Sequence, residues 1–415
     1  MNTFYDALET RSPEEREAAL MAALPRQIAH AQQASSAFAE ILAGADAAAV
    51  TTRAALARLP VTRKHALLER QTALRDADLF GGFATQGFGA AMPRVFSSPG
   101  PMYEPEGQRQ DYWRMARALY AAGFRAGELA HNCFSYHFVP AGSMMESGAH
   151  ALGCTVFPGG TGQTEQQAQA MAHMRPAGYI GTPSFLKLIL EKAAELQLPL
   201  PSLKKALLSA EAFPPSLRDW LAERGVAGYQ CYGTADLGLI AYETAAREGL
   251  VLDEGVVVEI VRPGTGDPVP DGEVGELVVT TLNPDYPLIR FGTGDLSAVL
   301  PGQCPTGRTN TRIKGWMGRA DQTTKVRGLF VHPGQVAAIA ARFPQVLRAR
   351  LVVSGEMAND QMLLQVETQE TAAGLAERLQ DAIRELTKLR GEVELVAPGS
   401  LPNDGKVIED ARSYR

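Results

Sequence analysis

Residues 286–333 read YPLIRFGTGDLSAVLPGQCPTGRTNTRIKGWMGRADQTTKVRGLFVHP, and the rest of the chain can be organised around this stretch. It holds two patterns typical of buried strands, each interrupted by a charged residue that an apolar core would not accept. Asp295 follows the glycine-rich segment 292–294, where the backbone can approach a ligand closely. Residues 318–321 read as a turn, and 325–328 as an alternating strand that ends on glycine. Taken alone, the patterns also fit two hairpins with solvated charges.

The composition is that of an ordinary globular enzyme. The 415 residues are enough for two or three domains with a sizeable core. They are 45% hydrophobic and 21% charged, which is typical of a globular protein. The formal net charge of −6 argues against nucleic acid or an anionic membrane as the main partner. The four cysteines lie far apart without a CxxC, so neither a disulfide framework nor a zinc knuckle is indicated. The polar start of the chain and the absence of a long apolar run predict a cytoplasmic protein without a membrane span.

The order of the sequence patterns predicts an α/β fold. Residues 12–80 are predicted to be mostly helical, with Ser12 as an N-cap. Between about 131 and 232, short apolar strands alternate with helices, which predicts a mostly parallel sheet flanked by helices. Residues 250–281 are rich in turns and strands and indicate an antiparallel or barrel-like subdomain. The C-terminal part has the strand and helix order of a small α+β domain.

The most specific motif is YGTAD at residues 232–236. It follows the predicted strand 228–231, and open α/β sheets bind ligands at the carboxyl ends of their strands. A threonine hydroxyl at position 234 can donate to a phosphate, and Asp236 can offer a carboxylate oxygen to magnesium. The structural alternative is a plain strand-to-turn connection with a solvated Asp236.

Together, these segments resemble the adenylate-forming acyl-CoA ligase superfamily, in its phenylacetate-CoA ligase-like branch. YGTAD resembles the Tyr-Gly-x-Thr/Ser-Glu motif, with Asp236 one methylene shorter than the usual glutamate. Residues 209–214, SAEAFP, resemble the segment that lines the adenine pocket. Asp295 resembles the aspartate that accepts hydrogen bonds from both ribose hydroxyls, since a carboxylate has two acceptor oxygens. The nucleotide-binding residues that the resemblance implies are Ser209, Ala210, Glu211, Tyr232, Gly233, Thr234, Asp295, Arg319 and Lys406.

The resemblance also implies a mobile C-terminal lid. Residues 401–406, LPNDGK, resemble the Pro-x-x-x-Gly-Lys motif that carries the adenylation lysine, with one residue fewer before the glycine. A cation near the α-phosphate offsets the charge that develops in carboxylate attack. Read without the resemblance, Lys406 is a solvated lysine and Glu211 is a carboxylate in the first turn of a helix. Asp321 occupies the hinge position, where the backbone absorbs the rotation of a lid.

The domain boundaries and the catalytic set follow from this resemblance. Residues 1–318 would form the nucleotide- and acid-binding domain, and 319–415 the lid. Lys406, Thr234 and Asp236 are the implied catalytic residues, and Asp236 is also the implied metal ligand.

Two further segments concern the acid and the phosphates. HNCFSY at 131–136 resembles the lining of the acyl pocket, which implies that His131, Phe134 and Tyr136 bind the substrate. The phosphate loop is rewritten: residues 97–107 read SSPGPMYEPEG where the family has Ser-Ser-Gly-Thr-Thr-Gly-x-Pro. Its three prolines lack N–H donors, and its two glutamates, Glu104 and Glu106, would repel a triphosphate.

The function implied by the resemblance is ATP-dependent activation of a carboxylic acid to an acyl-adenylate, followed by thioester formation with coenzyme A. The branch implies an aromatic, phenylacetate-like acid, with magnesium as the metal and AMP as a product. Relatives also suggest a homodimer. The rewritten loop leaves two alternatives open: a nucleotide-binding regulatory protein without adenylation, or an adenylating enzyme that uses a carrier-protein or cofactor acceptor.

Overall fold

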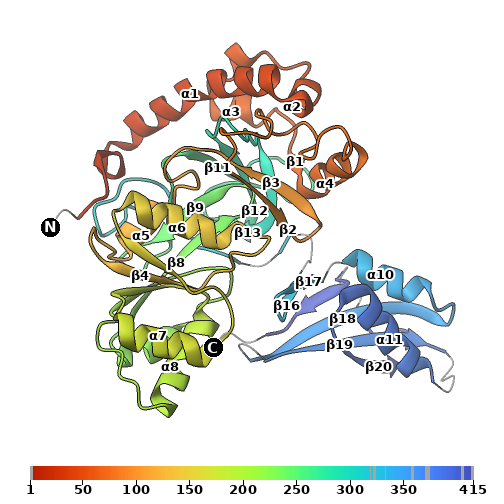
Figure 1. The fold of residues 1–415 in the computed structure, drawn as a ribbon. Helices are drawn as coiled ribbons and strands as arrows, with labels where there is room; N and C mark the ends of the chain where they lie inside the picture. The colour runs from red at the N-terminus through yellow and green to blue at the C-terminus, as the bar shows by residue number, and fades with distance from the viewer. Residues whose placement is uncertain are drawn as a thin grey trace. The chain divides into compact units, whose positions relative to one another are not determined.

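A computed structural model describes residues 3–317, 319–320, 324–331, 333–356, 359–369, 374–402 and 406–412. The chain divides into two compact units, Met1–Met317 and Gly318–Arg415 (Figure 1). Each unit has its own hydrophobic core and is described by itself below.

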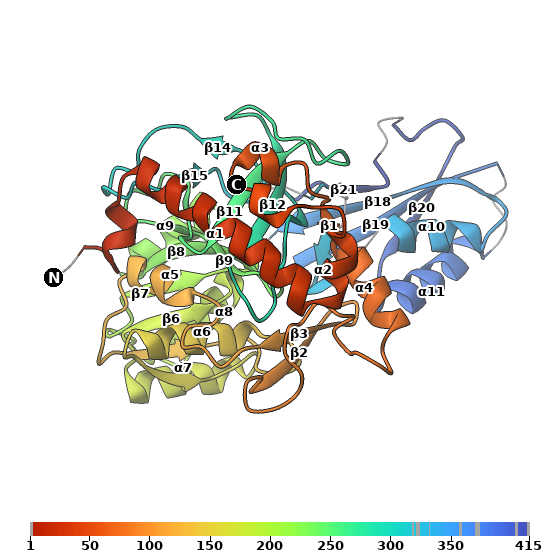
Figure 2. The ribbon, with the colours of Figure 1, turned by 90° about the horizontal axis from the view of Figure 1, so that it is seen from above.

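The first unit begins with helices that pack over a sheet. Helix α1 (Pro13–Ala34) starts in a capping box, in which the Ser12 hydroxyl accepts from the Glu15 N–H at 3.1 Å and the Glu15 carboxylate accepts from the Ser12 N–H at 3.0 Å. Its buried face contributes Leu24 and Ile28 to the core, and the helix runs along the outside of the unit (Figure 2). The remaining elements of this region are η1 (Ala7–Thr10), α2 (Ser36–Ile41), η2 (Ala47–Ala49), α3 (Arg53–Leu56) and α4 (Lys64–Ala73).

The larger sheet confirms the predicted parallel arrangement. Its nine strands lie in the order β14-β15-β10-β9-β8-β7-β6-β4-β5, and the five from β8 to β5 are parallel. The strands are β4 (Leu129–Asn132), β5 (Thr155–Pro158), β6 (Gly178–Gly181), β7 (Lys205–Leu208), β8 (Ala227–Thr234), β9 (Gly238–Glu243), β10 (Leu250–Leu252), β14 (Val299–Leu300) and β15 (Arg312–Ile313). The helices are α5 (Met115–Ala121), α6 (Ala141–Ala151), α7 (Thr164–Met174), α8 (Pro183–Glu195) and α9 (Pro215–Glu223), and α5 and α6 share a core with β4, β6 and β7.

A four-stranded sheet forms the β-rich part of the unit, in the order β1-β13-β12-β11. Its strands are β1 (Thr62–Arg63), β11 (Val256–Val261), β12 (Gly275–Thr281) and β13 (Phe291–Ser297). The pairs from β11 to β13 are antiparallel, whereas β1 is parallel to β13. Residues 97–107, which the sequence presented as a loop, belong largely to a β-hairpin of β2 (Arg94–Ser98) and β3 (Met102–Glu106).

A buried ion pair holds this sheet to the chain before β1. Arg290 is 2% exposed, and its guanidinium donates to both oxygens of Glu259 on β11, at 2.9 and 3.1 Å. The same group donates to the carbonyls of Ala57, at 2.8 Å, and Gly266, at 2.7 Å. One buried cation therefore ties together three separate segments of the unit.

The second unit is a small α+β domain, as predicted. Its main sheet has the order β20-β19-β18-β21, and a hairpin of β16 and β17 precedes it. The elements are β16 (Thr324–Val326), β17 (Leu329–Val331), α10 (Pro333–Ala341), β18 (Val346–Glu356), β19 (Asn359–Thr368), α11 (Leu375–Thr387), β20 (Glu392–Val396) and β21 (Ile408–Asp410). Both helices and the four-stranded sheet contribute to one core.

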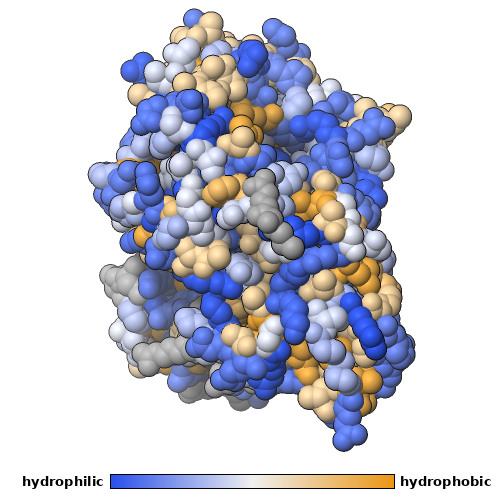
Figure 3. All heavy atoms as spheres, turned by 90° about the vertical axis from the view of Figure 1, so that its left-hand side faces the viewer, coloured by the Kyte–Doolittle hydropathy of each residue, from blue (hydrophilic) through white to orange (hydrophobic). Residues whose placement is uncertain are grey.

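The face drawn in Figure 3 is mostly hydrophilic, with small hydrophobic areas scattered across it. Among the described residues, no helix combines the length and the apolar character needed to cross a membrane.

We expect Arg290→Ala to lower the free energy of unfolding of the first unit by about 3–5 kcal/mol, because it leaves Glu259 buried without its partner. Urea unfolding followed by tryptophan fluorescence would measure this, since Trp113, Trp220 and Trp316 all belong to the first unit. Lys187→Ala removes a half-exposed helical ion pair with Glu191 and should cost only about 0.5 kcal/mol. Equal losses in the two variants would contradict the role given to Arg290.

Candidate active site

The YGTAD motif spans the end of β8 and the tight turn into β9. A Cβ atom on Gly233 would lie 2.5 Å from the carbonyl oxygen of Gly238, so the two strands can approach this closely only without a side chain. Thr234 accepts a hydrogen bond from the Leu237 N–H at 3.1 Å. Because its hydroxyl acts there as an acceptor, its proton can be donated to a ligand. This is the geometry expected of a phosphate contact at the carboxyl end of a strand.

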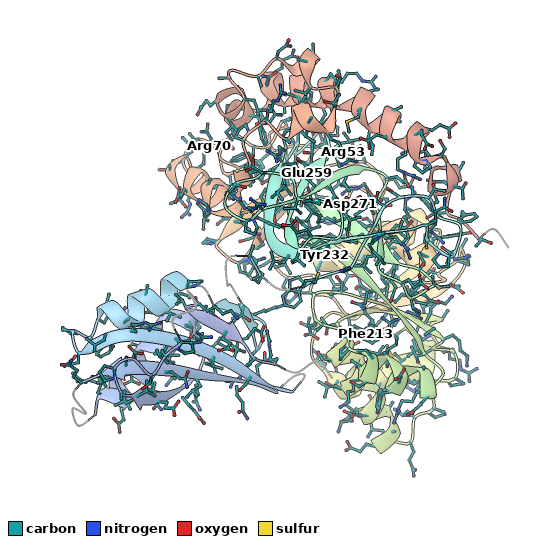
Figure 4. All side chains as sticks on the ribbon, turned by 180° about the vertical axis from the view of Figure 1, so that it is seen from behind. Arg53, Arg70, Phe213, Tyr232, Glu259 and Asp271 are labelled. Carbon is teal, nitrogen blue, oxygen red and sulfur yellow. The ribbon has the colours of Figure 1, made fainter. Side chains whose placement is uncertain are left out.

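Asp295 lies on β13, and both of its carboxylate oxygens accept hydrogen bonds. The Tyr232 hydroxyl donates to Oδ2 at 2.7 Å, and the Trp316 indole N–H donates to Oδ1 at 3.0 Å. Asp295 is 8% exposed. In the view of Figure 4, Tyr232 lies between Glu259 on one side and Phe213 on the other. The structure thus brings Tyr232 and Asp295 together, as the predicted nucleotide site requires.

Asp236 pairs with a lysine that the sequence reasoning missed. Lys64, the first residue of α4, places its Nζ 3.0 Å from Oδ2 of Asp236. Asp236 is 3% exposed, and within the described part of the chain its Oδ1 has no hydrogen-bond partner. A buried carboxylate oxygen of this kind is a suitable ligand for a hard cation. The predicted alternative of a solvated Asp236 is therefore wrong.

The hairpin glutamates differ from the expectation drawn from their sequence. Glu104 is fully buried and accepts hydrogen bonds from the Ser98 hydroxyl and, at 3.2 Å, from the Ser98 N–H. Burial, and then the negative charge of Asp236, raise the pKa of Glu104 to about 8. Glu106 is also buried and accepts from Arg94 at 3.3 Å. Glu104 thus holds its proton more tightly than a free glutamate, so the expected repulsion of a triphosphate by two free carboxylates is reduced.

The predicted adenine segment follows β7. The Ser209 hydroxyl donates to the Cys231 carbonyl on β8 at 2.8 Å, and Ala210 has a left-handed backbone with φ of 68°. Glu211 accepts from the Ser184 hydroxyl at 2.5 Å, in the first turn of α8. Glu211 lies four residues before α9 (Pro215–Glu223), so the alternative reading of a carboxylate in the first turn of a helix is wrong. Its side chain instead contacts the N-terminal turn of α8. Its role toward adenine stays a prediction.

The predicted acyl segment forms a polar network at the end of β4. His131 is fully buried, its Nε2 lies 2.6 Å from the Gln167 side-chain oxygen, and burial lowers its pKa. Asn132 donates to the Tyr136 hydroxyl at 2.8 Å, which donates to Glu146 at 2.7 Å. Phe134 is buried in the core shared with α5 and α6. The substrate roles of His131, Phe134 and Tyr136 stay predictions.

The remaining predicted residues belong to the second unit. Arg319 lies at its start, and Lys406 lies two residues before β21. The proposed hinge residue, Asp321, lies outside the described residues. Within the part of the chain that is described, no group of three or more His, Cys, Asp or Glu side chains could hold a metal by itself. A magnesium ion would therefore need oxygen ligands from the nucleotide or water besides Asp236.

Comparisons with known proteins identify the family of this chain. The family model of AMP-binding enzymes matches residues 111–283, and that of the AMP-binding enzyme C-terminal domain matches 328–411. A phenylacetate-coenzyme A ligase of Thermus thermophilus is 34% identical over 76% of this chain and 72% of its own length. Another, from Aromatoleum evansii, is 30% identical over 83% of this chain and 81% of its own. The chain therefore belongs to the adenylate-forming AMP-binding enzymes, in the phenylacetate-coenzyme A ligase-like branch.

A solved structure extends the likeness in fold to the whole chain. It is a crystal structure of 2-hydroxyisobutyryl-CoA ligase in complex with 2-HIB-AMP and CoA, in the thioesterification state. The TM-score is 0.84 at 24% identity, with 100% of this chain and 93% of the other chain covered. The fold of both units is thus that of an adenylate-forming ligase.

We predict that Glu104 makes the protein less stable as the pH rises. Its pKa is 4.5 in an unfolded chain and about 8 in the folded one, so only the folded state holds this proton between those values. The free energy of unfolding should therefore fall across pH 5–8 by an amount on the order of a few kcal/mol. Urea unfolding of the wild type and of Glu104→Gln, which keeps a neutral side chain, would measure the difference in slope.

The exposed Glu165 supplies the control for this measurement. Glu165→Gln removes one carboxylate from the surface of α7 and tests whether loss of charge alone changes the slope. Identical slopes in the wild type and Glu104→Gln would show that Glu104 is ionised in the folded protein throughout this range.

Proposed function

We propose that this protein is an acid–thiol ligase that uses ATP to convert a carboxylic acid into an acyl-adenylate and then transfers the acyl group to coenzyme A. The observation that carries the proposal is the hydrogen bond from Tyr232, near the end of β8, to Asp295 on β13, in a chain of this family whose Thr234 and Asp236 follow Tyr232 in the same motif. The named relatives support an aromatic, phenylacetate-like acid as the substrate class. A homodimer stays a prediction.

The residues of the first unit would bind and orient ATP. Asp295 offers two acceptor oxygens to the ribose hydroxyls. Thr234, whose oxygen already accepts from Leu237, would direct its proton to a phosphate oxygen. Ser209–Glu211 and Gly233 would border the base and the phosphates, and Arg319 of the second unit would add a positive charge. Together these contacts would hold the α-phosphorus in reach of the acid.

Magnesium is the metal that the family implies, and Asp236 fits it through its buried Oδ1. When bound, the ion would neutralise part of the charge on the phosphate oxygens. Lys64, which pairs with Oδ2 of the same carboxylate, would hold that side chain in one orientation. Asp236 is one methylene shorter than the glutamate usual in the family, but its contact with Lys64 would hold its side chain in place.

The two half-reactions use the chain's residues at different moments. In the first, a carboxylate oxygen of the acid attacks the α-phosphorus and pyrophosphate leaves, while Lys406 would offset the developing negative charge. In the second, the thiol sulfur of coenzyme A attacks the acyl carbonyl and loses its proton, and AMP leaves. We propose that rotation about the region of Asp321 exchanges Lys406 for the β16 strand between the two steps.

The regulatory alternative loses part of its support. It was motivated by the rewritten loop, with its prolines that lack N–H donors and its two glutamates. Burial raises the pKa of Glu104 to about 8, and Glu106 is paired with Arg94. The hairpin would therefore repel a polyphosphate less than two free carboxylates would.

We expect acid-dependent exchange of pyrophosphate into ATP, tested over a panel of aryl and short aliphatic acids. Aryl acids should give the highest rates. Lys406→Ala should reduce this exchange by about 10²–10³-fold, the usual effect of removing one group that stabilises developing charge. The same variant should still form the thioester from a supplied acyl-adenylate and coenzyme A.

Lys388→Ala, at the end of α11, controls for the loss of a lysine from the second unit. No exchange with any acid, in a protein that binds AMP, would overturn the proposed ligase activity. Equal loss of both half-reactions in Lys406→Ala would instead contradict a role for this residue in adenylation alone.

We further expect Asp236→Asn to raise the magnesium concentration needed for half-maximal exchange by about tenfold or more, because an amide oxygen is a weaker ligand for a hard cation. Exchange rates at a fixed excess of ATP and acid over a magnesium titration would measure this. Asp253→Asn, which removes a buried carboxylate paired with Arg114, is the matched control. An unchanged magnesium requirement in Asp236→Asn would exclude this residue as the ligand.

A further inference from the structure

The two hydrogen bonds to Asp295 use the acceptors that the proposed function assigns to a ribose. Tyr232 donates to one oxygen at 2.7 Å and Trp316 to the other at 3.0 Å. A carboxylate oxygen at a buried position has few directions from which a donor can approach. A ribose that binds with both hydroxyls to Asp295 must therefore share or replace these contacts.

The two donors differ in how firmly they are held. Tyr232 lies within β8, where it pairs with Ala241 of β9, and its ring packs against the larger core. Trp316 lies outside the regular elements, and 44% of its surface is exposed. Moving Tyr232 would disturb a strand and a core contact, whereas moving the indole would expose only a side chain that already faces solvent. Trp316 is thus the donor that a ligand can replace.

The backbone around Trp316 is fixed, so the side chain can turn by itself. On one side, the Gly315 carbonyl accepts from the Ser297 hydroxyl at 2.7 Å. On the other, the Met317 N–H donates to the Leu296 carbonyl at 2.9 Å. Both contacts are made with residues of β13, the strand that carries Asp295. A change in the side-chain torsions of Trp316 would release the indole N–H without moving this segment.

We propose that Trp316 occupies a ribose-binding oxygen of Asp295 in the free enzyme and that a ribose hydroxyl displaces it when a nucleotide binds. The inference rests on the proposed function, because it takes Asp295 as the ribose acceptor. In the free protein the indole N–H donates to a carboxylate oxygen of a residue that is only 8% exposed. Trp316 would thereby weaken nucleotide binding and assist the release of AMP at the end of each turnover.

The test compares AMP binding in the wild type, Trp316→Phe and Tyr232→Phe by isothermal titration calorimetry. Trp316→Phe keeps an aromatic ring but removes the competing N–H, so it should bind AMP about 2–10-fold more tightly. Tyr232→Phe removes the donor that stays in place and orients the carboxylate, so it should bind AMP more weakly by a similar factor. The opposite signs of these two changes distinguish displacement from a general effect on Asp295.

A second measurement follows the fluorescence of the tryptophans as AMP saturates the site. The emission of Trp316, obtained as the difference between wild type and Trp316→Phe, should change, because the indole loses its carboxylate partner. Weaker AMP binding by Trp316→Phe, or an emission that stays constant at saturation, would overturn the inference while leaving the proposed function intact. A wild-type protein that binds neither AMP nor ATP would overturn both.

Discussion

The hydrogen bond from Tyr232 to Asp295 joins the two large sheets of the first unit at the place where the site lies. Tyr232 belongs to β8 of the nine-stranded sheet, and Asp295 to β13 of the four-stranded sheet. A carboxylate this deeply buried requires donors, because an unpaired buried charge is strongly destabilising. The packing of the sheets and the proposed recognition of a ribose hydroxyl therefore depend on the same group.

A second polar contact crosses between the sheets beside the first. Lys64 follows directly on β1, which pairs with β13 so that Arg63 lies opposite Gly292, and it reaches Asp236 in the turn after β8. The carboxylates Asp295 and Asp236 are thus each bound from the opposite sheet. This arrangement fixes the distance between the parts of the site that would hold the ribose and the phosphates, and it does so with side chains that come from distant parts of the sequence.

The motifs of the site could be predicted from the sequence because each follows a recognisable strand. YGTAD and Asp295 come after apolar runs whose alternation is visible in the letters alone, and the parallel order of β5 to β8 follows from alternating strands and helices. Lys64 could not be found in this way. Strand β1 is only two residues long, which is too short for any periodic signal, and its pairing with β13 is set by tertiary packing. Trp316 was missed for a related reason, since an indole next to a glycine-rich turn carries no pattern that marks it as a hydrogen-bond donor to Asp295.

The hairpin shows most clearly where reading formal charges from a sequence fails. Burial and the negative charge of Asp236 raise the pKa of Glu104, while Lys64 lowers it. The Ser98 hydroxyl and N–H donate to Glu104, and Lys64 pairs with Asp236 nearby. Glu104 therefore holds its proton more tightly than an exposed glutamate would. A polyphosphate approaching residues 97–107 would therefore meet less repulsion than the charges of Glu104 and Glu106 suggest. The changed sequence of this segment is compatible in this respect with the chemistry of the family.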